Sequence, residues 1–135
     1  MMTDLVFRVP AIRLAEAQAA HQPDHTFMYR FDWPSNAFDG RLGSCHSLEI
    51  PFVFNNLQRP GVGMLTGPDA PQSIADEMHS AWIEFVRNDD PGGSPPRAWP
   101  PYEPAAGRAT MLFDVPSRVE PDPDGHEREL WEAHL

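Results

Sequence analysis

Three side chains that could carry acyl-transfer chemistry stand side by side in the run Gly43-Ser44-Cys45-His46. A hydroxyl or a thiol can attack a carbonyl carbon when a nearby imidazole accepts its proton. An exposed serine nucleophile needs a Gly-x-Ser-x-Gly turn between a strand and a helix, and the sequence contains no such pattern. Cys45 has no basic neighbour to stabilise its thiolate. We interpret Ser44 and Cys45 as small structural residues and keep His46 as a candidate general base or structural histidine.

Two other groups of residues resemble metal-ligand sets. His21 and His25 are four residues apart, but Pro23 between them breaks the helix that would bring both to one face. The acidic run at 120–125 resembles the start of a calcium loop. Its two prolines stiffen it, however, and Trp131 stands where such a loop needs a glutamate. We predict no metal site and no cofactor.

Three helices are predicted from apolar residues that recur at helical spacing. They cover residues 3–20, 73–87 and 126–134. Pro10 predicts a kink, or two abutting helices, within the first of them. In the second helix, Ser73 and Asp76 form a capping-box-like pair. One apolar face of that helix is predicted from Ile74, Met78, Trp82, Phe85 and Val86.

Two strands are predicted, at 26–33 and 109–114, and residues 117–120 either continue the second strand or pair beside it. The stretch 34–72 contains no long periodic element, and a Pro/Gly-rich connector covers 91–108. Strands joined by a long crossover are parallel, and such sheets are covered on both faces, which two strands cannot achieve alone. The predicted fold class is therefore α/β, with few strands and an incomplete sheet.

Residues 43–54 read Gly-Ser-Cys-His-Ser-Leu-Glu-Ile-Pro-Phe-Val-Phe and resemble the histidine loop of type-B carboxylesterases, the family of para-nitrobenzyl esterases and cholinesterases. The similarity extends along the chain in the family's order. It includes Thr3-Asp4-x-x-Phe7-Arg8-x-Pro10-Ala11, Tyr29-Arg30-Phe31-Asp32, Trp82-x-x-Phe85, Trp99-Pro100-x-Tyr102 and Met111-x-Phe113. The resemblance implies that residues 1–135 form the C-terminal part of an α/β-hydrolase domain.

The resemblance also implies roles for two residues. His46 matches the base of a Ser-Glu-His triad, and Glu49 matches an acidic position that supports the site or the loop without being the triad acid. The family's serine, oxyanion loop and triad glutamate precede the matched part, so the resemblance implies that this chain lacks them. Asp32, Asp39 or Glu49 could replace the acid. None could replace the nucleophile or the oxyanion donors, which are worth roughly 100–1,000-fold in rate.

Composition excludes several other functions. Twenty acidic residues against ten arginines give a formal charge of −10, and without a basic stripe nucleic acid is not an expected partner. A single cysteine excludes an intrachain disulfide framework. Neither a signal peptide nor an apolar run of about 18 residues is present. We therefore expect no membrane partner and, by default, a cytoplasmic location.

Three hypotheses remain open at this point. The chain could hydrolyse a small-molecule ester once an N-terminal esterase segment completes it. It could instead be an inactive truncated relic or an interaction module of the same family. Self-association is a third possibility, because unpaired strand edges can join separate copies. The ester preferred cannot be predicted, since the pockets of such enzymes are built largely from preceding residues.

Overall fold

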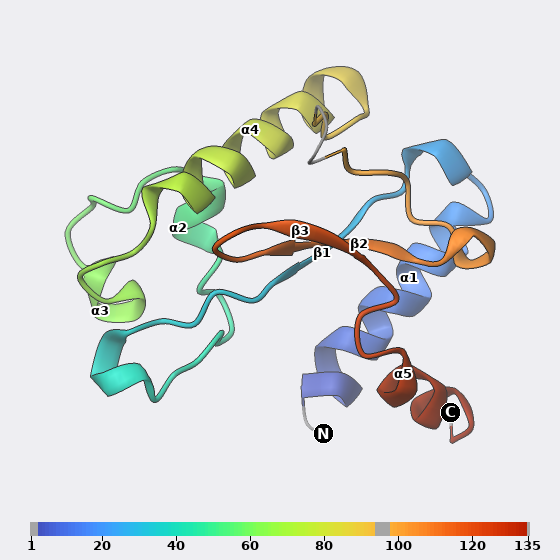
Figure 1. Ribbon diagram of the computed structural model, residues 1–135, viewed down its shortest axis with the longest axis horizontal. Coiled ribbons are helices and arrows are strands. Elements are labelled where there is room, and N and C mark those ends of the chain that lie inside the picture. The colour runs from blue at the N-terminus through green and yellow to red at the C-terminus, as the bar shows by residue number, and fades with distance from the viewer. Residues whose placement is uncertain (1–2, 94–97, 135) are drawn as a thin grey trace. The chain divides into compact units, whose positions relative to one another are not determined.

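The computed structural model describes residues 3–93 and 98–134. Short helices and irregular segments separate the longer elements (Figure 1). In chain order the elements are η1 (Asp4–Arg8), α1 (Val9–Ala19), η2 (Pro23–His25), β1 (Met28–Phe31), η3 (Ala37–Gly40), α2 (Ile50–Val53), α3 (Gly63–Thr66), α4 (Gln72–Asn88), η4 (Pro104–Ala106), β2 (Ala109–Phe113), β3 (Arg118–Pro121) and α5 (Gly125–Glu132). The α/β prediction is confirmed. No helix within the described ranges is long and apolar enough to span a membrane.

The chain forms two compact units. Unit 1 comprises Met1–Met28, Trp99–Thr110 and Val119–Leu135, and contains α1 and α5. Unit 2 comprises Tyr29–Ala98 and Met111–Arg118, and contains α2, α3 and α4. The candidate base at position 46 therefore belongs to unit 2.

The N-terminal helical region contains the interruption that its proline predicts. Residues Asp4–Arg8 form a π-helical turn, and α1 begins directly after it with Pro10 in its first turn. Proline suits that position because its missing N–H would have no helical partner there. The prediction of two abutting helices is confirmed. The buried side chains of α1 are Val9, Ala15 and Ala19.

The strands form a sheet in the order β1-β2-β3. The backbone amides of Asp32 and Trp33, just beyond the end of β1, both donate to the carbonyl of Phe113, the last residue of β2. The carboxyl ends of the two strands therefore lie together, as in the parallel pair that was predicted. The segment predicted at 117–120 is β3, and it pairs beside β2. Strand β1 is shorter than the predicted 26–33. Its regular hydrogen bonding to β2 ends at Asp32 and Trp33, whose amides share the single carbonyl of Phe113.

Helix α4 confirms the predicted helix at 73–87 but not its predicted cap. Pro71 occupies the N-cap position, and no side chain caps the helix. The Asp76 carboxylate instead accepts hydrogen bonds from Asn55 (3.0 Å) and Gln72 (2.9 Å). The capping-box prediction was therefore wrong, because the helix starts one residue earlier and this carboxylate is engaged by neighbouring amides.

The predicted apolar face of α4 is buried only in its first half. Ile74 and Met78 are almost fully buried, whereas Trp82 is 40% and Val86 is 74% exposed. The first half packs against α2, where the His79 ring nitrogen Nδ1 lies 2.9 Å from the carbonyl oxygen of Val53. The amphipathic pattern thus marks a face that is only partly covered in this chain.

The stretch 34–72 contains only the four-residue elements η3, α2 and α3, as the missing periodicity predicts. An aromatic cluster nevertheless anchors it to the sheet. The Phe52 ring centroid lies 4.9 Å from that of Phe31 and 5.4 Å from that of Trp33. Of the predicted connector at 91–108, residues 94–97 lie outside the described residues.

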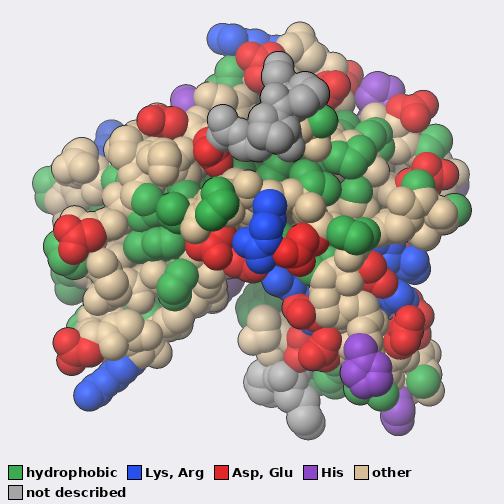
Figure 2. Space-filling view, in the orientation of Figure 1, with side chains coloured by type: hydrophobic (Ala, Val, Ile, Leu, Met, Phe, Trp, Pro, Cys, Tyr) green, Lys and Arg blue, Asp and Glu red, His purple; other side chains and the backbone are tan. Residues whose placement is uncertain are grey.

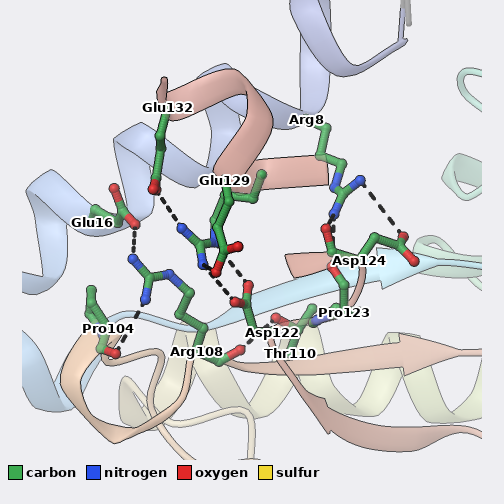
Figure 3. Close-up of polar contacts among 11 residues, drawn as sticks. Arg8, Glu16, Pro104, Arg108, Thr110, Asp122, Pro123, Asp124, Glu129 and Glu132 are labelled. Carbon is green, nitrogen blue, oxygen red and sulfur yellow. Dashed lines mark hydrogen bonds and ion pairs between the residues drawn. The ribbon is translucent and has the colours of Figure 1, made fainter. Parts of the chain in front are cut away.

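In unit 1, a network of ion pairs joins α5 to the segment that precedes it (Figure 3). Arg128, only 8% exposed, donates to both carboxylate oxygens of Asp122 at 3.0 and 2.8 Å. It also bonds Glu132 at 2.5 Å. The Arg128 hydrogen bonds hold the pKa of Asp122 below its ordinary value. Such two-pronged pairing fixes orientation as well as charge.

Candidate active site

His46 lies at the tip of a tight turn between η3 and α2. The amide of Leu48 donates to the carbonyl of Cys45 (3.2 Å), which makes His46 and Ser47 the two central residues of a β-turn. Ser47 has a φ of +67°, the conformation that a type II turn requires at this position. A side chain other than glycine adopts it at a cost of about 1–2 kcal/mol. The turn is therefore held by its surroundings, and it leaves His46 exposed.

The start of this turn is tied to the end of β1. The backbone of Ser35 bridges to Gly43, with its N–H donating to the Gly43 carbonyl at 3.1 Å. The Ser44 hydroxyl donates to the carbonyl of Asp32 at 2.5 Å. Because Asp32 also bonds the last residue of β2, the turn lies at the carboxyl ends of both parallel strands. In open α/β sheets, this edge is where ligands bind.

The other end of the turn is anchored in the core of unit 2. Leu48 and Phe52 are both completely buried, and the amides of Phe52 and Val53 donate to the carbonyl of Glu49. Glu49 therefore occupies the N-cap position of α2. Only residues 44–47 project between the bridge at Gly43 and the buried Leu48.

Three carboxylates are candidate replacements for the triad acid, and each has its own surroundings in the structure. Asp32 accepts two hydrogen bonds from the Arg30 guanidinium, at 2.5 and 2.8 Å, because the two residues lie on one face of an extended chain. Burial raises the pKa of Tyr29, and the negative charge of Glu49 raises it further, so Glu49 acts on this phenol. Asp39 is exposed within η3, at a φ of +58°.

The remaining sequence candidates are not brought into this turn as reactive groups. The Ser44 hydroxyl is engaged by the backbone, and Cys45 is a half-buried free thiol. His21, just beyond the end of α1, and His25, the last residue of η2, are both exposed in unit 1. Asp122 of the acidic run is bound by Arg128. Within residues 3–93 and 98–134, no group of three or more His, Cys, Asp or Glu could hold a metal ion.

Sequence reasoning missed two residues that support the site. The Arg30–Asp32 pair could have been found, since opposite charges two apart on a strand share a face. Ser35 carries no such signal. It looks like an ordinary turn residue after a proline, yet it is 1% exposed and bonds three backbone groups.

Solved structures of carboxylesterases superimpose on almost the whole chain. A carboxylesterase of Geobacillus stearothermophilus matches with a TM-score of 0.80 and 43% identity, over 96% of this chain and 26% of that one. A structure of a PNB esterase matches with a TM-score of 0.73 and 34% identity, over 96% of this chain and 25% of that one. The sheet, its helices and the turn at its carboxyl edge are thus part of an α/β-hydrolase fold.

The sequence comparison identifies the family within this fold. The model of the carboxylesterase family matches residues 1–131. The para-nitrobenzyl esterase of Bacillus subtilis (strain 168) is 35% identical over 137 residues, covering 96% of this chain and 26% of that protein. The chain belongs to the carboxylesterase family. It spans about a quarter of the length of the relatives that it matches.

Proposed function

We propose that the chain supplies the general base of a serine carboxylesterase, and that His46 is this base. Its substrate class is small carboxylic esters. The observation that carries the proposal is the place of His46: an exposed turn, tied at both ends, at the carboxyl edge of two parallel strands in a member of the carboxylesterase family.

In the proposed reaction, a ring nitrogen of His46 accepts the proton of a serine hydroxyl while the serine oxygen attacks the acyl carbon. The protonated imidazole then donates that proton to the departing alkoxide, which leaves as the alcohol. In the second half, His46 takes a proton from water as the water oxygen attacks the acyl-serine. It returns the proton to the serine when the carboxylic acid leaves. An imidazole suits both steps because its ordinary pKa lies near neutrality.

The other catalytic groups come from the rest of the family fold, on the same polypeptide or on a partner. The sequence has no Gly-x-Ser-x-Gly, so the nucleophile is not Ser44. Asp32 is a poor triad acid because Arg30 already neutralises it. Removal of oxyanion donors alone costs roughly 100–1,000-fold, so the 135 residues by themselves are expected to be inactive.

A chimeric esterase tests this proposal. The chain replaces the matching quarter of the Geobacillus stearothermophilus carboxylesterase, and hydrolysis of a chromogenic ester is measured. The chimera should turn over the ester, and His46→Ala should lower kcat by roughly 10⁴-fold or more. His21→Ala and Cys45→Ala should retain full activity, because one lies in unit 1 and the other is a packed thiol.

Folding of each chimera is checked by circular dichroism and by its elution volume. A folded chimera that is inactive, or that keeps its activity after His46→Ala, contradicts the proposal. Robust turnover by the isolated 135-residue chain contradicts the requirement for the preceding part of the fold.

The second candidate function is a non-catalytic interaction module. The exposure of large apolar side chains favours it, among them Phe38 (64%) and Phe54 (66%). This hypothesis expects no labelling by a serine-directed fluorophosphonate after the chain is mixed with the preceding part of an esterase. Labelling of the mixture would exclude it.

A further inference from the structure

Ser35 connects the His46 turn with a segment that lies elsewhere in the sequence of unit 2. We propose that Ser35 is a positioning residue, which fixes the His46 turn to the segment 63–67 so that the place of the imidazole depends on that segment. The effect of this positioning on catalysis rests on the function proposed for His46. The positioning itself can be measured without any reaction.

Three hydrogen bonds converge on Ser35. Its backbone N–H donates to the carbonyl of Gly43 at 3.1 Å. Its hydroxyl donates to the carbonyl of Leu65 at 2.5 Å and accepts the amide of Ala37 at 3.0 Å. Because the residue is 1% exposed, water cannot take the place of the hydroxyl at the Leu65 carbonyl and the Ala37 amide when the hydroxyl is removed. The hydroxyl thus joins the backbone that follows β1 to α3, and the backbone N–H of the same residue joins it to the His46 turn.

The step from Gly43 to His46 is short and constrained. Residues 44–47 form the whole projection between the Gly43 bridge and Leu48, which is completely buried. Within this projection, the Cys45–Leu48 hydrogen bond and the positive φ of Ser47 fix the turn type. A shift of Gly43 is therefore passed to His46 and cannot be absorbed by a slack loop.

The contact on the other side of Ser35 is equally close. A Cβ atom placed on Gly67 would lie 1.7 Å from Oδ1 of Asn36 and 2.8 Å from the backbone nitrogen of Ala37. The backbone after Ser35 therefore lies directly on Gly67, whose φ is +81°. The buried Thr66 hydroxyl lies 3.0 Å from the carbonyl oxygen of Gly67 and 3.3 Å from that of Val62, the residue just before the segment. The segment 63–67 is thus a firm support.

The experiment uses the full 135-residue chain with isotope-labelled histidine and follows the imidazole signals by NMR. The His46 signal is assigned by its loss in His46→Gln. Ser35→Ala should shift and broaden the His46 signal while the signal of His79, held on α4 by Val53, stays in place. Ser35→Thr keeps the hydroxyl, so its His46 signal should remain near that of the unsubstituted chain.

Two matched controls separate positioning from loss of stability. Ser117 is also a buried serine of unit 2 whose hydroxyl bonds a backbone carbonyl, that of Asp114, so Ser117→Ala should leave His46 unchanged. Gly67→Ala should also shift the His46 signal, because its new Cβ atom would push on the backbone that follows Ser35. Gly63→Ala, which meets nothing within 4 Å, should not.

An unchanged His46 signal in folded Ser35→Ala overturns the proposal, as does a displacement in Ser35→Thr as large as in Ser35→Ala. If Ser35→Ala does not fold, hydrogen exchange in the unsubstituted chain decides. The amides of Ser35 and Ala37 should exchange as slowly as that of Leu48, and fast exchange of either one overturns the proposal.

The same substitution in the chimeric esterase gives the catalytic consequence. A catalytic group that is misplaced by about 1 Å can lower the rate roughly 100-fold. A smaller shift of the imidazole in Ser35→Ala should therefore lower kcat about tenfold with KM unchanged. If His46→Ala leaves the chimera active while Ser35→Ala moves the NMR signal, the proposed function fails and the positioning stands. If the NMR signal does not move, the positioning fails whatever the chimera does.

Discussion

Tyr29 and Glu49 show how a residue at the edge of a candidate site can act on the core behind it. The Tyr29 ring lies edge-on to Trp82 (6.2 Å between ring centroids) and to Phe113 (5.7 Å). Burial and the charge of Glu49 raise its pKa, and a hydrogen bond from the Trp82 indole partly opposes them. The charge of Glu49 thus acts on the phenol of Tyr29, whose ring contacts Trp82 of α4 and Phe113 of β2.

Glu49→Gln should lower the pKa of Tyr29, because it removes a negative charge that disfavours the phenolate. The measurement is an absorbance titration of the phenolate in a Tyr102→Phe background, where Tyr29 is the remaining tyrosine. Glu16→Gln is the control, since Glu16 acts on Tyr102. An unchanged titration after Glu49→Gln would show that the carboxylate does not face this phenol.

Residue types and spacing keep His46 only as a candidate base or structural histidine, and the resemblance of residues 43–54 to the histidine loop of the family is what implies roles for His46 and Glu49. The pairing of Asp32 with Arg30 decides against Asp32 as a replacement acid, and that pairing depends on a strand geometry that had to be predicted first. Ser35 could not be predicted at all. Its hydroxyl bonds Leu65, which lies 30 residues further along the chain, and no local pattern predicts that contact.

At the scale of elements, α2 shows how a four-residue helix can hold a loop in place. Phe52 points into the aromatic cluster of unit 2 and is completely buried, whereas Phe54, two residues later, is 66% exposed. The two phenylalanines therefore form a matched pair on one short segment.

Phe52→Ala should lower the free energy of unfolding by about 3–5 kcal/mol, as expected for a large aromatic side chain removed from a packed core. Phe54→Ala should change it by less than about 0.5 kcal/mol, because its side chain is mostly in water. Chemical denaturation of both variants checks the prediction. Equal losses would mean that α2 is not anchored through Phe52.

Helix α5 is held by the ion pair between Arg128 and Asp122. Asp122→Asn should lower the free energy of unfolding at neutral pH by about 2 kcal/mol, the scale of a charged hydrogen-bonded pair. Glu129→Gln is the control, since Glu129 is exposed and 3.7 Å from Arg128, where ion pairs contribute about 0–1 kcal/mol. Denaturation curves of the two variants make the comparison, and a loss in Glu129→Gln as large as in Asp122→Asn would contradict it.

The same pair sets a pH dependence with a definite sign. Folding lowers the pKa of Asp122, so its contribution is complete above the ordinary value of 3.8 and is lost as the pH falls through the lower folded-state pKa. The unfolding free energy of the unsubstituted chain should therefore fall in this acid range. Asp122→Asn should flatten the fall, and an unchanged slope would contradict the assignment.

Helices and strands were largely predictable because apolar periodicity and proline positions act locally. Pro10 predicts an interruption, which is seen as the π-helical turn before α1, and β3 is one of the two alternatives left open for residues 117–120. The cap of α4 was not predictable. Ser73 and Asp76 have the right spacing for a capping box. The Asp76 carboxylate is bound instead by the side-chain amides of Gln72 and of Asn55, which lies 21 residues earlier in the chain.

At the scale of the whole molecule, large apolar side chains are exposed in both units of the chain. Hydrophobic patches interrupt the acidic and basic side chains on the face shown in Figure 2. In unit 1, Phe7 and Leu14 are 52% and 71% exposed, and in unit 2, Met64 and Val86 are 73% and 74% exposed. Contiguous exposed apolar patches are typical of surfaces that contact further protein, so contact of this chain with further protein stays a prediction.

Self-association is one use of this surface and stays a prediction. Size-exclusion chromatography over a range of chain concentrations should show an elution volume that decreases as the concentration rises. A concentration-independent monomer would exclude it. Addition of the preceding part of an esterase should suppress self-association, because the two partners compete for the same apolar side chains.

The most direct test of the account is fluorophosphonate labelling of a two-piece esterase. The 135-residue chain is mixed with the remaining part of the Geobacillus stearothermophilus carboxylesterase, which in our proposal supplies the nucleophilic serine. The account predicts rapid labelling with the unsubstituted chain and with His21→Ala, and labelling slowed by roughly 10³-fold or more with His46→Ala. Labelling at the same rate with His46→Ala, in a complex of unchanged size, would contradict the assignment of His46 as the base.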